Sequence, residues 1–350
     1  MQQSNEIKQI NITEIKPNRF QPRIKFDEKA YKQLQQQGNH LPSKEYYFKK
    51  GITWSLFGFN SFNVRYKEEG YVFDVSGSSL FVDDVLEKYI LGYLSSNVAF
   101  FYLSALAPTV NFQVGNIANL PIIIQEDKMY EINRLVASLI NKAKFIDSQD
   151  ELSWHYQANA FYSNYNCAIS FDENIKNYKH QMEDLYKQIE EEENQLNNIY
   201  NDIFKMKSNC VNHNQQNKVT FCRIIEDLLS YLMGVVFNRY QIDNYVTSLN
   251  VQVFNEIKVV TKEIKFLIIH KMGIDGLKQL ETLLGHLIDD YFKDYYGKRH
   301  ILKYHNLPIY WYQIVDGRQM IGYYHSLLNM EKEKGIKYNY LKINAQYKIK

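Results

Sequence analysis

The stretch from Tyr89 to Gln125 contains no Asp, Glu, Lys or Arg, in a chain in which 23% of all residues are charged. A run of this kind is poorly suited to a wet surface, so it predicts burial in a protein core or in a membrane. Ser95, Ser96 and Asn97 interrupt the run. Each apolar part then has about half of the roughly 20 residues that a spanning helix needs. We therefore expect a buried helix followed by a buried loop.

The two segments that flank this loop both have helical patterns. Asp83 or Asp84 can cap a helix that Pro108 ends. After the loop, apolar residues recur with helical spacing over 127–145 and predict an amphipathic helix. Its expected apolar face consists of Met129, Ile132, Leu135, Val136, Leu139 and Ile140. The loop itself, "PTVNFQVGNIANLPIII", is expected to be an uncharged joint that ends in a strand. Its asparagines can satisfy neighbouring backbone groups there.

The composition indicates a folded intracellular protein. Hydrophobic residues make up 45% of the 350 residues, enough for two or three structural units with a real core. The three cysteines form no Cys-x-x-Cys pair, so neither a disulfide framework nor a zinc site is expected. The sequence MQQSNEIKQI lacks the apolar core of a signal peptide. We expect a reducing, cytoplasmic location.

Charge is spread unevenly along the chain, although the net charge is only +2. Residues 1–50 hold ten Lys or Arg against five Asp or Glu, and residues 298–350 hold ten against three. Basic ends of this kind can bind phosphates, but they can equally be solvated tails. Charge alone leaves these two interpretations open.

The periodicity predicts a helix-rich α+β protein. Alternation around Val64, Tyr66, Tyr71 and Phe73 predicts two strands joined at Gly70. The expected helices are a long polar one over 172–207, a mostly buried one over 224–240 and further helices within 251–296. Two strands are expected around an Asp316–Gly317 turn. The expected domains are 1–45, a small mixed α/β domain over 46–125, a helical spacer over 126–300, and a strand pair with a basic tail over 301–350.

Residues 10–34 contain "EIKPNRFQPRIKFDE", which resembles the opening segment of ParB-type partition proteins. The arginine-rich nucleotide-binding motifs and the helix-turn-helix of that family do not follow. The likeness therefore implies neither CTP binding nor recognition of a centromere.

A second resemblance covers residues 46–325 and rests on a series of segments in order. They are "FKKGITWS", "RYKEEGYVFDVSGSSLF", "LGYLSSNVAFFYL", "PTVNFQVGNIANLPII", "EEENQLNNIYNDIF", "LLSYLMGVVFNRYQID" and "LPIYWYQIVDGRQMIGYYH". This series resembles the C-terminal half of the PglX family, the adenine-specific DNA methyltransferases of BREX phage defence. The resemblance implies a target-recognition domain over residues 46–124 and a helical part after it. Its partners would be double-stranded DNA, a separate methyltransferase lobe, or other BREX proteins.

The chemistry that such an enzyme needs is not visible in this sequence. Amino-methyltransferases use an Asn/Asp-Pro-Pro-aromatic loop to hold the target amino group and stack on a flipped base. The six prolines here are never adjacent, and Gly77 in "DVSGSS" is a turn residue rather than a cofactor cradle. The histidines have no metal-ligand spacing. We therefore expect no catalytic, cofactor-binding or metal-binding residue here, and S-adenosylmethionine binding only in a full-length family enzyme.

Candidate DNA contacts follow from the resemblance and from residue type. Lys49 and Lys50 suit phosphates, and Arg65 suits a guanine edge. The whole candidate set is Lys49, Lys50, Thr53, Trp54, Ser55, Arg65, Asn111, Gln113 and Asn116. A bland alternative stands beside it, in which Trp54 is a core residue and Arg65 an ordinary surface residue.

Three hypotheses about function follow. The first is a DNA-recognition portion of a PglX-type adenine-N6 methyltransferase that lacks the methyl-transfer lobe and is inactive alone. The second is a non-enzymatic interaction subunit of a defence complex, which would use the helix over 172–207. The third is a recombined gene remnant, suggested by the switch from ParB-like to PglX-like sequence near residues 35–45.

Overall fold

A computed structural model describes most of the chain between Ser43 and Tyr324. The described residues are 43–58, 62–71, 73, 77–107, 111–153, 155–206, 219–237, 239–242, 257–304, 309–315 and 318–324. The ParB-like residues 10–34, the basic tail after 324 and part of "DVSGSS" lie outside them. The chain divides into two compact units. Unit 1 holds the described residues of Asp147–Lys179 and Thr220–Lys350, and unit 2 holds those of Lys29–Ile146 and His180–Val219.

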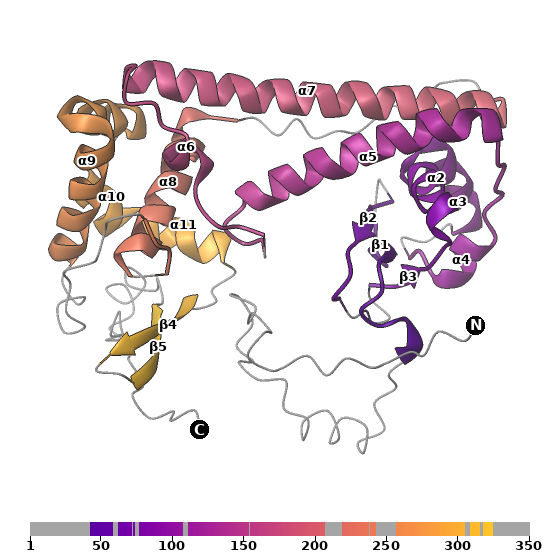
Figure 1. The fold of residues 1–350 in the computed structure, drawn as a ribbon, viewed down its shortest axis with the longest axis horizontal. Coiled ribbons are helices and arrows are strands. Elements are labelled where there is room, and N and C mark those ends of the chain that lie inside the picture. Colours follow the sequence, from indigo (N-terminus) through magenta and orange to yellow (C-terminus); the bar gives the residue numbers. More distant parts are fainter. Residues whose placement is uncertain are drawn as a thin grey trace, which may run out of the picture. The chain divides into compact units, whose positions relative to one another are not determined.

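Unit 2 contains a small antiparallel sheet, drawn in indigo in Figure 1. It consists of β1 (Gly51–Trp54), β2 (Val64–Lys67) and β3 (Ser79–Leu80) in the order β2-β1-β3. Ile52 and Trp54 of β1 are buried, so this face of the sheet covers the core. Successive side chains of a strand point to opposite faces, so the residues between them belong to the outer face. A short 3-10 helix, η2 (Lys44–Tyr46), precedes β1.

Gly70 forms a turn after β2, as the sequence predicts, and its φ of +94° explains why glycine stands there. The second predicted strand is wrong, because neither Tyr71 nor Phe73 lies in a strand. The backbone after the turn pairs with Phe48 instead. The Phe48 amide donates to the Tyr71 carbonyl at 2.9 Å, and the Gly70 amide donates to the Phe48 carbonyl at 2.9 Å.

The helix predicted before Pro108 forms as two, α2 (Asp84–Ser95) and α3 (Asn97–Leu106), with the break at Ser96. Ser96 is extended, and its hydroxyl accepts a hydrogen bond from the Ala99 amide, which caps α3. Among the described residues, no single helix is long and apolar enough to cross a membrane. Only α2 and α3 taken together reach that length and composition, and they bend by 69°.

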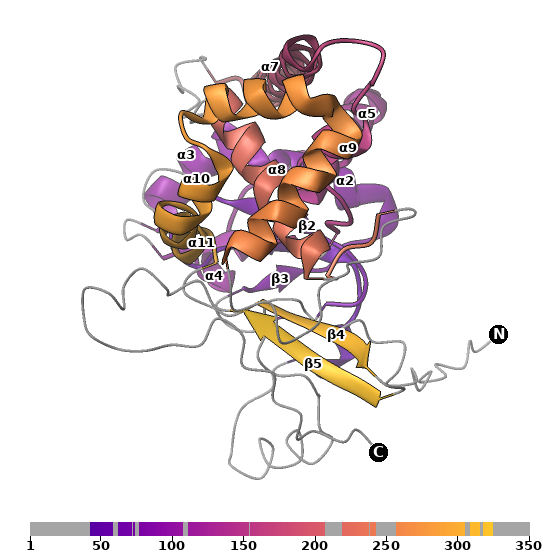
Figure 2. The ribbon, with the colours of Figure 1, turned by 90° about the vertical axis from the view of Figure 1, so that its left-hand side faces the viewer.

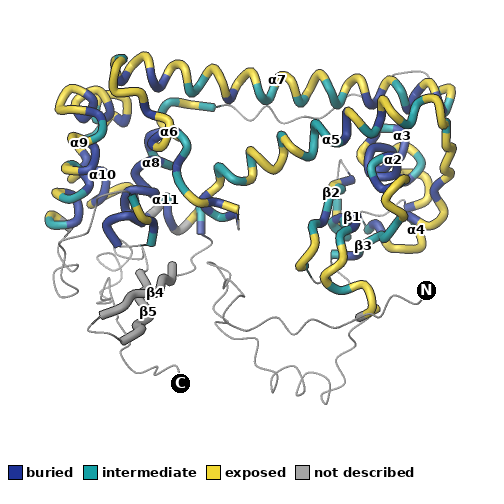
Figure 3. The backbone as a smooth tube through the Cα atoms, in the orientation of Figure 1, coloured by how far each residue is buried: buried dark blue, intermediate teal, exposed yellow. Residues whose placement is uncertain are grey.

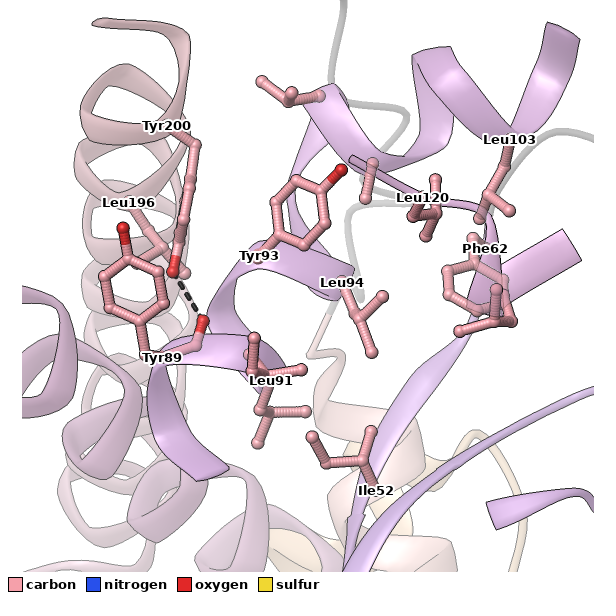
Figure 4. Packing of buried hydrophobic residues seen from close by; sticks show 14 of the residues in the cluster. Ile52, Phe62, Tyr89, Leu91, Tyr93, Leu94, Leu103, Leu120, Leu196 and Tyr200 are labelled. Carbon is pink, nitrogen blue, oxygen red and sulfur yellow. Dashed lines mark hydrogen bonds between the residues drawn. The ribbon is translucent and has the colours of Figure 1, made fainter. Parts of the chain in front are cut away.

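The core of unit 2 is built around α2 (Figure 4). Tyr89 and Tyr93 of α2 are buried against Tyr200 of α7 (Phe171–Phe204). The Tyr200 hydroxyl donates to the Tyr89 carbonyl at 2.6 Å. Gly92 permits this close approach, because a Cβ atom there would lie 2.9 Å from Val136 and 3.2 Å from the Tyr200 hydroxyl. The expected burial is therefore confirmed for the first part of the uncharged stretch.

The second part of that stretch does not form the predicted buried strand. Residues after Pro108 form a short helix, α4 (Val114–Ala118), and then a chain without regular structure. Ile122, Ile123 and Ile124 are 53%, 42% and 47% exposed, so the prediction of burial is wrong there. Pro121 has no amide hydrogen for a sheet ladder. The Tyr89 hydroxyl holds the segment instead, by donating to the Ile123 carbonyl at 2.9 Å.

Two long helices carry the predicted amphipathic patterns. In α5 (Glu126–Gln149), Ile132, Leu135 and Val136 are buried, and the other predicted apolar residues pack against the same core. The predicted long polar helix forms as α7, which is largely exposed (Figure 3). Within unit 2, a carboxylate oxygen of Glu192 on α7 accepts from Lys142 of α5 at 2.7 Å.

Unit 1 is helical apart from one hairpin. Its further helices are α6 (Ala160–Ser163), α8 (Phe221–Val236), α9 (Ile257–Leu284), α10 (Ile288–Asp294) and α11 (Tyr296–Lys303). The predicted burial of α8 is confirmed, and α8 and α9 lie side by side (Figure 2). β4 (Ile309–Val315) and β5 (Arg318–Tyr324) form the predicted antiparallel pair. Together with the sheet of unit 2, these elements confirm the helix-rich α+β fold class.

The interior of unit 1 holds a carboxylate, Glu151, that is 2% exposed. Its oxygens accept hydrogen bonds from the Ser230 hydroxyl at 2.5 Å and the Tyr240 hydroxyl at 3.1 Å. Arg239 and Lys303 lie 3.4 Å and 3.7 Å away as counter-charges. Burial opposes ionisation of Glu151, but the two cations and the hydroxyl hydrogen bonds together outweigh it, so the pKa of this carboxyl is lowered. The group therefore ties the loop after α5 to three other parts of unit 1, which are α8, the segment that follows α8, and α11.

Candidate nucleic-acid interface

The outer face of the sheet in unit 2 carries several of the predicted DNA contacts. Thr53 of β1 lies directly opposite Arg65 of β2 and Ser79 of β3. Residues that face each other across antiparallel strands share one side of a sheet, so these three side chains form one row. The register also pairs Gly51 with Lys67, which adds a second row to the same face.

Within the first row, only Arg65 is exposed, and Thr53 and Ser79 are half-buried. Its guanidinium reaches the Ser55 hydroxyl at 3.5 Å, which is a weak restraint. The Thr53 hydroxyl donates to the Ser78 carbonyl at 2.9 Å and thereby fixes the start of β3. Arg65 is therefore free to reach a ligand, whereas Thr53 already has a structural role.

Trp54 lies on the opposite face of the sheet and is 2% exposed. Its indole N–H donates to the Phe112 carbonyl at 2.9 Å, and its ring packs near Phe62. Because the ring and its only donor are both committed to the interior, this residue supports the fold rather than a DNA contact. The alternative interpretation, in which Trp54 is a core residue, is therefore the better one.

Lys50 is held by two carboxylates of α2. Its ammonium lies 2.8 Å from Asp84 and 3.4 Å from the buried Glu87. The hydrogen bond to Asp84 raises the pKa of Lys50, and the same bond lowers the pKa of Asp84. This lysine pairs the start of β1 with α2, which makes it a poor candidate for a phosphate contact.

Lys49, by contrast, is exposed, with its ammonium 5.1 Å from the centre of the Tyr46 ring. Its carbonyl accepts a hydrogen bond from the Lys67 ammonium at 2.6 Å. The backbone of Lys49 is therefore fixed, while its side chain remains available.

Lys67 is the residue that sequence reasoning missed. It is 7% exposed, and its ammonium lies over the rings of Phe73 at 5.3 Å and Phe81 at 4.8 Å. Burial lowers the pKa of Lys67. Tyr46 stacks on Phe81 at 4.7 Å, and Tyr47 meets Phe73 edge-on at 5.3 Å. We call Tyr46, Tyr47, Phe73 and Phe81 the aromatic patch. No short motif in the sequence marks it, because its members come from three separate segments.

Of the four remaining candidates, Ser55 is half-buried and holds Arg65, and the other three lie at or just before α4. Asn111 forms a β-bridge with Phe57 and is half-buried. Gln113 is exposed and caps the start of α4. Its backbone N–H donates to the side-chain oxygen of Asn116 at 2.9 Å. The Asn116 side chain in turn donates to the Leu106 carbonyl at 3.2 Å. The expectation that these polar side chains satisfy neighbouring backbone groups is met by Asn116.

The structure thus leaves three of the nine predicted contacts exposed, and they are Lys49, Arg65 and Gln113. Two cations and an amide on one small sheet and its flank can contact phosphates and base edges. No cluster of metal-ligating side chains occurs among the residues that the structure describes.

Comparison with known proteins finds relatives for most of the chain. The chain is homologous, at modest identity, to adenine-specific methyltransferases over 60% to 78% of its length. No protein-family model matches the chain.

Two relatives define the match. The chain is 25% identical over 323 residues to the adenine-specific methyltransferase PglX of Lacticaseibacillus casei (strain Zhang), which covers 78% of this chain and 26% of that protein. It is 28% identical over 235 residues to the adenine-specific methyltransferase BrxX of Escherichia coli O9:H4 (strain HS), which covers 60% of this chain and 19% of that protein. The predicted resemblance to PglX is therefore confirmed. The aligned part spans about a quarter or less of each relative.

Proposed function

We propose that these 350 residues form the DNA-recognition portion of a PglX-type adenine-N6 methyltransferase of phage defence, and that they do not transfer a methyl group by themselves. The observation that carries the proposal is the homology, which covers 78% of this chain but 26% of PglX. The exposed Lys49 and Arg65 support it as phosphate and base contacts. The sequence contains no pair of adjacent prolines, which the methyl-transfer loop of such enzymes requires.

Binding to duplex DNA at several salt concentrations tests the recognition role. Lys49→Ala should weaken binding to all sequences and reduce the salt dependence by about one phosphate contact. Arg65→Ala should weaken binding and relax sequence preference, with a loss of about 1–3 kcal/mol if it reads a guanine. Lys187→Ala, an exposed lysine of α7, is the control. Unchanged binding by both interface variants would refute the recognition role.

Inactivity is tested by transfer of a labelled methyl group from S-adenosylmethionine to DNA. The purified chain should leave the DNA unlabelled. Labelled DNA would overturn this half of the proposal and leave the recognition half standing.

A second candidate function is docking to a separate methyltransferase lobe, and the exposed Ile122–Ile124 segment favours it. The Tyr89 hydroxyl accepts from the Gln125 amide at 3.2 Å and donates to the Ile123 carbonyl, so the segment is held in place. An apolar strip fixed at the surface suits a protein contact.

Co-purification with a methyltransferase lobe of a PglX-type enzyme tests this docking. Ile123→Asp should abolish the association and leave DNA binding intact. Val85→Asp, at a residue of α2 that is 68% exposed, is the matched control. Equal association of both variants would refute docking through this strip.

A further inference from the structure

Phe48, an aromatic residue that is not among the nine predicted DNA contacts, has an unusual backbone conformation. Phe48 has a φ of +64°, in the left-handed region that bulky side chains rarely adopt. Its side chain is nevertheless 61% exposed, so burial of the ring does not explain the strain. Strained residues of this kind persist where the surroundings fix them, and they gather at functional sites.

The surroundings of Phe48 do fix its backbone. Its amide and its carbonyl are both hydrogen-bonded to the Gly70–Tyr71 turn, at 2.9 Å each. The next carbonyl, that of Lys49, accepts from the buried Lys67 ammonium at 2.6 Å. Three hydrogen bonds on two consecutive residues therefore fix the backbone at Phe48, next in sequence to Tyr47 of the aromatic patch, while Phe48 itself stays exposed.

We propose that Phe48 stacks on an unstacked nucleobase of bound DNA, which rests on the DNA-recognition function proposed above. An aromatic side chain has few rotatable bonds, and the Phe48 backbone is already fixed, so stacking on a base carries a low entropic cost. Every base offers a flat face for such a contact. The neighbouring Lys49 supplies a cation for the adjacent phosphate. Glu45 within η2 and Glu69 before Gly70 are both exposed, and they disfavour a phosphate at the ring itself. They are compatible with the uncharged face of a base.

Binding of the full chain to two probes tests the proposal. The probes are a mixed-sequence 30-base-pair duplex, and the same duplex with one unpaired adenine. An unpaired base costs less to unstack, so the wild-type chain should prefer the second probe. Phe48→Ala should lose about 5- to 100-fold in affinity for that probe and lose the preference. Phe48→Trp should retain both.

Two further variants separate stacking from other effects. Phe101→Ala removes a ring of α3 that is 53% exposed in the same unit, and it should bind both probes as the wild type does. Phe48→Gly relieves the left-handed strain, so its unfolding midpoint should equal or exceed that of the wild type while its DNA binding falls as in Phe48→Ala. The salt dependence should stay unchanged in both Phe48 variants, in contrast to Lys49→Ala.

The outcomes distinguish this inference from the recognition function. If the wild type binds DNA and the Lys49 and Arg65 variants weaken it, but Phe48→Ala does not, the stacking role alone is overturned. Loss of stability in Phe48→Gly, together with unchanged binding, would assign Phe48 to the fold. A wild-type chain without affinity for either probe would refute both proposals.

Discussion

Two buried charged side chains, Glu151 in unit 1 and Lys67 in unit 2, offset the cost of desolvation in different ways. In unit 1, Glu151 has two counter-charges, Arg239 and Lys303, and hydroxyl donors. In unit 2, the ammonium of Lys67 has a carbonyl and two ring faces, and no ion pair to it occurs among the described residues. The first arrangement stabilises a closed interior. The second holds the rim of an exposed surface in place.

The contrast in pKa follows from these partners. Burial alone disfavours both charges, but the cations and hydroxyl donors around Glu151 together outweigh burial and lower its pKa. In the part of the chain that the structure describes, no counter-charge offsets burial at Lys67. Its pKa is therefore lowered, which favours the neutral amine. Removing one member of a buried ion-pair cluster costs stability, because its partners stay buried without their counter-charge. A buried charge without an ion pair can be replaced by an apolar side chain at a lower cost in stability.

The largest expected effect is that of Glu151→Ala. The substitution takes the Glu151 carboxylate away from the buried Arg239 and leaves Lys303 with Asp227 alone of its two carboxylates, which costs about 3–5 kcal/mol of unfolding free energy. Hydrogen exchange should show loss of protection in α8, with α2 of unit 2 unchanged. Glu190→Gln, at an exposed residue of α7, is the control and should leave both helices protected. An α8 that stays protected in Glu151→Ala would break the comparison.

The second test compares the unfolding free energies of Glu151→Gln and the wild type as the pH is lowered. Because the folded pKa of Glu151 is lowered, its contribution is complete above the unfolded pKa of about 4.5 and is lost as pH falls through the folded value. The difference in unfolding free energy should be constant from pH 6 to pH 8 and shrink below that unfolded value. A difference that does not depend on pH would show that the carboxylate is not ionised in the folded protein.

Lys67→Met should have a much smaller effect, within about 1 kcal/mol at neutral pH, because the lost hydrogen bond is offset by relief of desolvation. The folded pKa of Lys67 is lowered below its ordinary 10.5. Between these two pKa values the unfolded chain binds more protons, so the wild type should gain stability relative to Lys67→Met as pH rises toward 10.5. Urea midpoints of both proteins over this range measure it. A wild type that loses stability relative to the variant would contradict the lowered pKa.

The smallest expected effect on stability is that of Lys49→Met. Its ammonium lies over the Tyr46 ring at an exposed position, where such contacts are weak. The urea midpoint should stay within experimental error, while DNA affinity falls. A clear drop in the midpoint would mean that this lysine belongs with the structural residues of the sheet.

Sequence patterns predicted the elements whose apolar residues recur with a helical period. The apolar face of α5 followed from spacing, because a helix must bury such a face, and the burial of α8 followed from its apolar composition. The candidate interface was harder to predict. By residue type, Lys49 and Lys50 were equally good candidates for a phosphate contact. In the structure, Asp84 and Glu87 of α2 form ion pairs with Lys50 and not with Lys49. Which of two adjacent lysines meets a carboxylate depends on how strand and helix pack.

The uncharged stretch from Tyr89 to Gln125 shows the same division. Its sequence by itself determined that α2 is a core helix, since charge-free helical turns are stable only when packed. Its sequence did not determine the fate of Ile122–Ile124, which lie at the surface although they are as apolar as the core. Burial needs a partner surface as well as an apolar side chain. The tertiary structure decided where such partners stand, and it likewise decided that Gly70, Tyr71 and Lys67 fix Phe48 in its exposed position.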